Sequence, residues 1–201
     1  MKEAPLWLRR LAAVLSFLGH PLLAVPAFVG LLVGPQLSHR QAAWALGSML
    51  LLVLPLGLWN LRQTKRGAYS NFDVSEARQR RSFYPVLLVL LGLGTAVLFW
   101  QQEGGPFRYG VLVVWAMLLL CYLLNFWLKV SLHAAISFFL AGAAVYLYPG
   151  WGGLALLLAV LVAASRWVLD RHTPAELLAG AALGGAAYGG LLWLLEQPLP
   201  G

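Results

Sequence analysis

The chain has 201 residues, of which 61% are hydrophobic and only 10% are charged. Soluble domains carry about 25% charged residues, so this composition excludes an ordinary soluble domain and indicates an integral membrane protein. The formal net charge of +7 could suggest nucleic acid, but the basic residues lie between apolar runs rather than on one amphipathic face. We therefore expect membrane lipids with anionic headgroups as partners, and no nucleic acid.

Long uncharged runs follow one another along the chain. A membrane-spanning helix needs about 20 apolar residues. Uncharged runs of that size or longer occupy residues 11–34, 41–60, 82–100, 109–128, 130–165 and 177–195. The run 130–165 is too long for one span, and Pro149 and the glycines at 150, 152 and 153 predict a turn in its middle. The sequence therefore predicts an all-α, polytopic membrane helix bundle of about seven transmembrane helices, forming a single membrane domain over residues 1–201.

The first and last runs have features of their own. His20, Pro21 and Pro26 predict a kink in the first helix, and we interpret His20 as a packing residue. A basic N-terminal flank leaves a cleaved signal peptide as an alternative, which would reduce the count to six helices, but the apolar stretch is longer than a signal peptide needs. In the last run, the four-residue spacing of its glycines predicts close packing against another helix. These glycines are Gly180, Gly184, Gly185 and Gly189.

Seven helices place three polar segments on the same membrane face. They are residues 61–82, the junction at 129–133, and residues 165–176. An even number of helices separates each segment from the next. Because these segments contain nearly all the polar residues capable of chemistry, one shared site at that face becomes possible.

Two of these segments are ambiguous when taken alone. Arg78 and Arg81 at the start of the third helix suit a positive-inside flank, but guanidinium forks also match phosphate oxygens. Lys129, Ser131 and His133 stand at the start of the fifth helix, where a histidine is explained by hydrogen-bonded packing.

The third segment is more specific. Thr173, Pro174 and Glu176 form a helix-start signature, with a Thr cap, Pro at the first helical position and Glu three residues after the cap. Capping does not explain Ser165-Arg166 upstream, nor His172 directly before the cap. A phosphate at that place would also meet the exposed amides of a helix N-terminus.

Together the three segments resemble the motifs of the type 2 phosphatidic acid phosphatase (PAP2) superfamily. Those motifs are a basic stretch ending Arg-Pro, then Pro-Ser-Gly-His, then Ser-Arg-x5-His-x3-Asp. The third is matched by Ser165-Arg166, His172 and Glu176, with Glu for the usual Asp. The second is matched in part by Ser131 and His133.

The sequence departs from the family pattern at several positions. Val130 and Leu132 replace the Pro and Gly of the second motif, Ser82 replaces the Pro of the first, and the leading Lys of the first is not evident. By the order and helix spacing of its motifs, the resemblance extends over a PAP2-like catalytic core at residues 73–195.

The resemblance implies a membrane phosphatase that hydrolyses a lipid phosphate monoester or a prenyl or lipid diphosphate through a phosphohistidine intermediate. His172 would be the nucleophile, Glu176 would orient its ring, and His133 would protonate the departing alkoxide. It implies no metal and no other cofactor. The implied phosphate-binding residues are Arg78, Arg81, Lys129, Ser131, Ser165 and Arg166.

Two alternatives stay open. A lipid transporter would use the same polar junctions to line a pathway, and a catalytically inactive relative would follow from the departures at Leu132 and Glu176. The expected partner is a lipid phosphate substrate within a bacterial inner or plasma membrane, and the sequence does not indicate which oligomeric state the protein has.

The excess of Lys and Arg on the motif face predicts a cytoplasmic active site, contrary to the extracytoplasmic site common in this superfamily.

Overall fold

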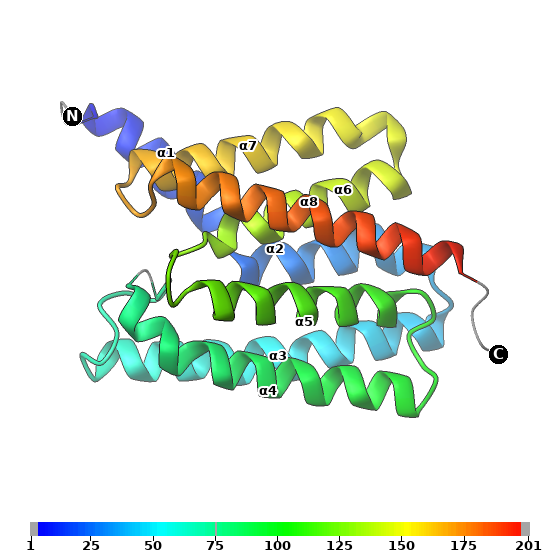
Figure 1. Ribbon diagram of the computed structural model, residues 1–201. Coiled ribbons are helices and arrows are strands. Elements are labelled where there is room, and N and C mark those ends of the chain that lie inside the picture. Colours follow the sequence, from blue (N-terminus) through cyan, green and yellow to red (C-terminus); the bar gives the residue numbers. More distant parts are fainter. Residues whose placement is uncertain (1–3, 75, 198–201) are drawn as a thin grey trace. The chain divides into compact units, whose positions relative to one another are not determined.

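The computed structural model describes residues 4–74 and 76–197, and in this part of the chain there are helices and no strand (Figure 1). The α-helices are α1 Leu6–Leu18, α2 Pro21–Phe28, α3 His39–Lys65, α4 Ala77–Trp100, α5 Phe107–Leu124, α6 Leu132–Leu147, α7 Gly152–Val168 and α8 Pro174–Glu196. The shorter turns are η1 Val29–Val33, η2 Gly34–Gln36 and η3 Pro149–Trp151. The predicted all-α fold is confirmed.

Five helices of the described chain are long and apolar enough to cross a membrane, namely α3, α4, α5, α7 with η3, and α8. The first helices pass the same test only as a pair, Leu6–Leu18 with Pro21–Gln36, bent by 52°. Helix α6 is apolar but has only 16 residues, fewer than the roughly 20 of a typical span. The polytopic membrane protein is therefore confirmed, with five or six spans by length and composition and one shorter apolar helix.

The bend between α1 and α2 lies where the sequence predicted a kink. Pro21 disfavours helical geometry at the residue before it, so α1 ends at Leu18 and α2 begins at Pro21 itself. The backbone N–H of Leu22 donates to His20 Nδ1 at 3.2 Å, so the histidine side chain caps the start of α2. This contact fixes the position of the His20 ring.

Several helices extend beyond the uncharged runs. Helix α3 continues to Lys65, and α4 begins at Ala77, five residues before the run that starts at residue 82. Lys and Arg are good helix formers with long flexible stems, so charges end the hydrocarbon-spanning stretch without ending the helix. The arginines of the first motif-like segment consequently lie on a helix.

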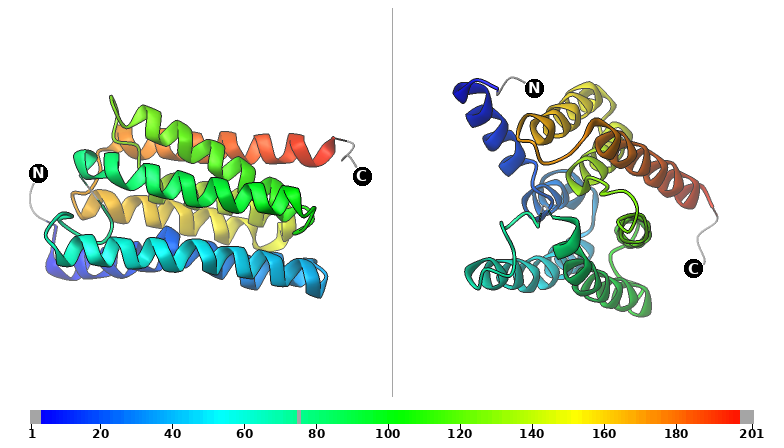
Figure 2. Two further views of the ribbon diagram at one scale, coloured as in Figure 1. Left: turned by 90° about the horizontal axis from the view of Figure 1, so that it is seen from below. Right: turned by 60° about the vertical axis from the view of Figure 1, so that its left-hand side comes forward.

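The chain forms two compact units. The first comprises Met1–Val25 and Leu128–Tyr188, and the second comprises Pro26–Trp127 and Gly189–Gly201. In the second unit α4 and α5 run side by side (Figures 1 and 2), and Trp115 Nε1 of α5 donates to the Leu88 carbonyl of α4 at 3.0 Å. The first unit contains α1, α6, α7 and most of α8.

Helices α6 and α7 form a hairpin in the first unit, joined by η3 at the predicted turn (Figure 2). Helix α1 packs against α7, and Gly19 approaches Val162 so closely that an added Cβ would overlap that side chain. At their exposed ends, Arg9 Nη1 and Asp170 Oδ2 form an ion pair at 3.0 Å. Helix α1 is thus seated on α7 at two points.

Helix α8 meets α6 along a line of small residues. A Cβ added to Gly180 would lie 2.6 Å from the Ser131 carbonyl oxygen, and one added to Gly184 would overlap the Ala135 carbonyl oxygen. The predicted close approach is confirmed at these two glycines. The prediction is wrong for Gly185 and Gly189, where an added Cβ would meet no described atom within 4 Å. This contact holds the start of α6 against the first turns of α8.

Candidate active site

The start of α8 carries the capping box that the sequence predicted. The backbone N–H of Glu176 donates to Thr173 Oγ1 at 3.3 Å, and the N–H of Thr173 donates to Glu176 Oε2 at 3.1 Å. The same carboxylate oxygen lies 2.8 Å from His172 Nδ1. Capping and pairing with His172 are therefore not alternatives, because one oxygen does both.

The contact with Glu176 determines how the His172 ring carries its proton. An ionised carboxylate only accepts hydrogen bonds, so Nδ1 carries the hydrogen and donates it. In the neutral ring Nε2 then holds the lone pair. His172 is only 4% exposed, and a buried imidazole held in one tautomer is suited to act as a nucleophile.

Lys129 joins this cluster from the loop before α6. Its Nζ donates to the Arg171 carbonyl at 2.9 Å and lies 3.8 Å from Glu176 Oε2. Its ammonium group partly offsets the charge of the carboxylate. Lys129 is thus held by two groups of the segment before α8.

The start of α6 is attached to the same place by its backbone. The N–H of Ser131 donates to the Glu176 carbonyl at 3.2 Å, and Ser131 Oγ accepts from the N–H of Ala134 at 3.4 Å, which caps α6. Ser131 and His133 are both buried, at 0% and 4% exposure. The structure therefore brings the second and third motif-like segments together, as the sequence predicted.

Ser165 and Arg166 are buried near the end of α7. The Ser165 hydroxyl donates to the Val162 carbonyl at 2.6 Å, so in this geometry its hydrogen is directed into its own helix and not toward a ligand. Arg166 is 1% exposed, and its Nη1 donates to Ser16 Oγ of α1 at 2.5 Å. The guanidinium is thus oriented by a helix 150 residues away in the sequence.

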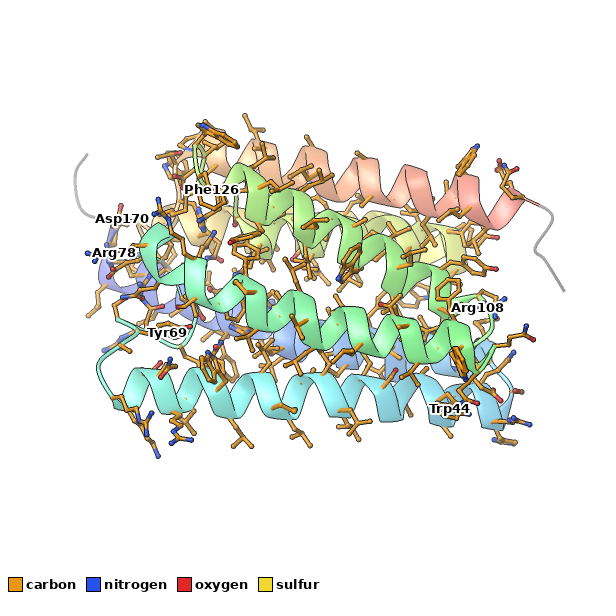
Figure 3. The ribbon with its side chains drawn as sticks, turned by 60° about the horizontal axis from the view of Figure 1, so that its bottom comes forward. Trp44, Tyr69, Arg78, Arg108, Phe126 and Asp170 are labelled. Atoms are coloured by element: carbon orange, nitrogen blue, oxygen red, sulfur yellow. The ribbon has the colours of Figure 1, made fainter. Side chains whose placement is uncertain are left out.

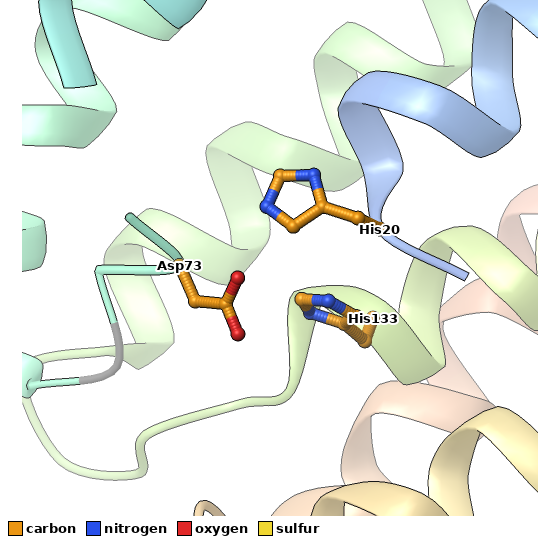
Figure 4. Close-up of side chains that lie close together, drawn as sticks. All are labelled: His20, Asp73 and His133. Carbon is orange, nitrogen blue, oxygen red and sulfur yellow. The ribbon is translucent and has the colours of Figure 1, made fainter. Parts of the chain in front are cut away.

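His20 lies against His133, a contact that sequence reasoning missed. The ring centroids are 5.2 Å apart and the ring planes meet at 87°, an edge-to-face arrangement (Figure 4). A polar residue inside an apolar run was the one sequence signal for such a contact. The interpretation of His20 as a packing residue describes its burial but not its partner.

In the second unit, the arginines of α4 differ in environment. Arg78 is exposed (Figure 3). The exposed Arg81 lies over the Phe126 ring, 5.4 Å from its centroid. Arg80 is only 2% exposed, and its Nε donates to the Val74 carbonyl at 3.0 Å. The guanidinium of Arg80 is therefore buried against the chain's own backbone and does not face the lipid headgroups. Phosphate binding by Arg78 and Arg81 stays a prediction.

Part of the chain matches the model of a known protein family. Residues 124–198 match the model of the PAP2 superfamily. The matched segment contains α6, α7 and α8, and with them His133, Arg166, His172 and Glu176. Helix α1 and residues 73–85 lie outside it. Searches of curated proteins and of solved structures gave no match.

Proposed function

We propose that this chain hydrolyses a lipid phosphate monoester or a prenyl or lipid diphosphate, because residues 124–198 match the model of the PAP2 superfamily, whose general function is that of a phosphatase. The observation that carries the proposal is the 2.8 Å contact between His172 Nδ1 and Glu176 Oε2. With Nδ1 engaged by Glu176, Nε2 is the ring nitrogen that attacks phosphorus in the proposed reaction.

In the proposed first step, His172 Nε2 attacks phosphorus and forms an N–P bond. The P–O bond to the lipid breaks, its electron pair leaves with the oxygen, and protonated His133 gives that oxygen a proton. Glu176 stabilises the positive charge that develops on the His172 ring. Arg166, with Arg78, Arg81 and Ser131, offsets the charge on the phosphoryl oxygens.

In the second step, water attacks the phosphohistidine and gives its proton to His133. The N–P bond breaks, the electron pair returns to Nε2, and inorganic phosphate leaves. The two steps restore both histidines to their starting forms. In this mechanism the motif residues contact only the phosphoryl group of the substrate, so they determine which reaction occurs. The lipid chain of the substrate lies in the apolar surroundings of the site.

A phosphate-release screen tests this function against the transporter alternative. Purified protein in lipid nanodiscs would be incubated with phosphatidate, phosphatidylglycerophosphate, and prenyl phosphates and diphosphates. We expect inorganic phosphate from at least one of them, and none from a matched His172→Ala preparation. Lipid movement across the bilayer without phosphate release from any substrate would favour a transporter. The absence of both lipid movement and phosphate release would favour an inactive relative.

The reaction should need no divalent metal. In the described part of the first unit the carboxylates are Asp170, paired with Arg9, and Glu176, which is already engaged by His172 and Thr173. We expect phosphate release to persist in excess chelator and to be inhibited by vanadate, a mimic of the trigonal-bipyramidal transition state. Strict dependence on added magnesium would contradict the mechanism.

We propose that the active site faces the cytoplasm of a bacterial cell. The five long helices, the bent pair α1–α2 and the shorter α6, each counted as one crossing, make seven crossings. Seven crossings would place on the motif face the N-terminus, with Arg9 and Arg10, and the end of α3, with Arg62, Lys65 and Arg66. Lys2 adds to this excess but lies outside the described residues. The opposite face would hold only Arg40 and Arg108. The excess of positive charge favours the cytoplasmic side even when the motif arginines are left out.

Cysteine labelling tests this orientation. In a Cys121→Ala background, Lys65→Cys should resist an impermeant maleimide in intact cells and react after lysis. Arg40→Cys is the matched control on the opposite face, and it should react in intact cells. The reverse pattern would place the active site outside the cytoplasm.

A further inference from the structure

Two polar side chains are buried around the break between α1 and α2. Ser16, in the last turn of α1, is 5% exposed, and His20, directly before α2, is 9% exposed, whereas Phe17 and Leu18 between them are 65% and 62% exposed. Ser16 and His20 are therefore turned into the protein at this break. Polar side chains buried in a membrane segment need specific partners.

The partner of Ser16 is an arginine of the third motif. Ser16 Oγ accepts from Arg166 Nη1 at 2.5 Å, and Arg166 itself is 1% exposed. A guanidinium has five N–H donors in a fixed planar fork, so holding one of them orients all the others. Ser16 thereby sets the plane in which Arg166 meets a phosphoryl group.

The partner of His20 is the histidine of the second motif. Because His20 Nδ1 accepts from the N–H of Leu22, the neutral ring carries its hydrogen on Nε2. The ring stands edge-on to His133, and one nitrogen of each ring lies within 4.8 Å of the other (Figure 4). The cap fixes His20, and the fixed ring limits how the His133 ring can turn.

Helix α1 is itself held in place on α7. Gly19 allows the close approach to Val162, and Arg9 pairs with Asp170 at the other end of the helix. Ser16 is therefore presented from a helix that is seated on α7, and His20 directly follows the anchored Gly19. This helix lies outside residues 124–198, which match the family.

From these contacts we infer that α1 and the break directly after it supply two positioning residues to the active site, Ser16 for the phosphate-binding Arg166 and His20 for the proton donor His133. The inference rests on the proposed phosphatase function. This N-terminal segment then aligns the group that holds the phosphate and the group that protonates the leaving oxygen. Neither Ser16 nor His20 takes part in bond making or breaking.

The test for Ser16 separates binding from turnover. Ser16→Ala removes the acceptor of a charge-assisted hydrogen bond, which we expect to raise KM and weaken vanadate inhibition by about tenfold. Ser16→Thr keeps the hydroxyl and should restore both values. In an Arg166→Ala background, Ser16→Ala should have little further effect, because its partner is gone.

The test for His20 separates its contact with His133 from its capping role. His20→Asn keeps an oxygen that can accept from the N–H of Leu22 and removes the ring. We expect kcat for a lipid phosphate to fall about tenfold and kcat for an aryl phosphate, which needs less acid help, to change much less. In a His133→Ala background, His20→Asn should have little further effect on either substrate.

Phe17→Ala, on the exposed side of the same turn, is the matched control and should leave all of these values unchanged. Equal losses on both substrates in His20→Asn, an unchanged KM in Ser16→Ala, or full additivity in the double variants would overturn the positioning role while His172→Ala remained inactive. Activity in His172→Ala would instead show that the proposed function had failed. Phosphorylation of His172 by aryl phosphate at saturating concentration reports in the Ser16, Phe17 and His20 variants whether the site is still folded.

Discussion

His172→Ala should abolish phosphate release from lipid and aryl phosphates alike. The substitution removes the atom that forms the N–P bond, and no leaving group, however good, can compensate for a missing nucleophile. Loss of a nucleophile costs many orders of magnitude, so we expect turnover to fall by more than about 10,000-fold. The measurement is kcat on both substrates with protein of unchanged melting temperature.

A second histidine serves as control for the first. His39→Ala changes the exposed first residue of α3, which has no place in the proposed mechanism, and should leave turnover unchanged. Aryl phosphatase activity near the normal level in His172→Ala would mean that another group is the nucleophile.

His133→Ala should lower turnover by an amount that depends on the leaving group. A lipid alkoxide is a poor leaving group that needs a proton as the P–O bond breaks, and general acid help is worth about 100-fold to 10,000-fold. We expect a loss of that size on lipid phosphate. An aryl phosphate leaves as a stabilised phenolate, so its turnover should fall distinctly less.

The fold-decrease in turnover on lipid phosphate, divided by the fold-decrease on aryl phosphate, distinguishes the two roles. This ratio should be large for His133→Ala. It should be close to one for His172→Ala, because both substrates need the nucleophile equally. Complete loss of aryl phosphate turnover in His133→Ala, together with near-normal aryl activity in His172→Ala, would reverse the assigned roles.

Local patterns in the sequence predicted much of this structure. The turn at Pro149, the kink before Pro21 and the cap at Thr173 all follow from the backbone limits of proline and from side-chain capping. The pairing of His172 with Glu176 fits their four-residue spacing across the start of α8. Each of these features depends on residues close together in the chain.

Helix phase explains two features that the sequence left ambiguous. Arg80 lies about 200° around a helix from Arg78, so one is buried while the other is exposed. In the same way, Gly185 is turned by about 100° from Gly184 and does not face α6. The sequence gives the angle between two residues around a helix. Which of them is buried depends on where the neighbouring helices pack.

Long-range contacts were not predictable from local pattern. Ser16 and Arg166 are 150 positions apart, and no spacing rule joins them. The same is true of His20 and His133, which belong to helices far apart in the chain. Only the presence of polar residues inside an apolar run hinted that the first helix had a role beyond spanning the membrane.

If His172 carries the phosphoryl group during turnover, the phosphorylated intermediate can be trapped. Protein turning over a lipid phosphate would be denatured in alkali, which preserves phosphohistidine, and the modified residue located by mass spectrometry. We expect one phosphoryl group on His172, attached at Nε2 because Nδ1 is held by Glu176. Phosphate release with His172 unmodified, or with the phosphoryl group on another residue, would contradict the proposed mechanism.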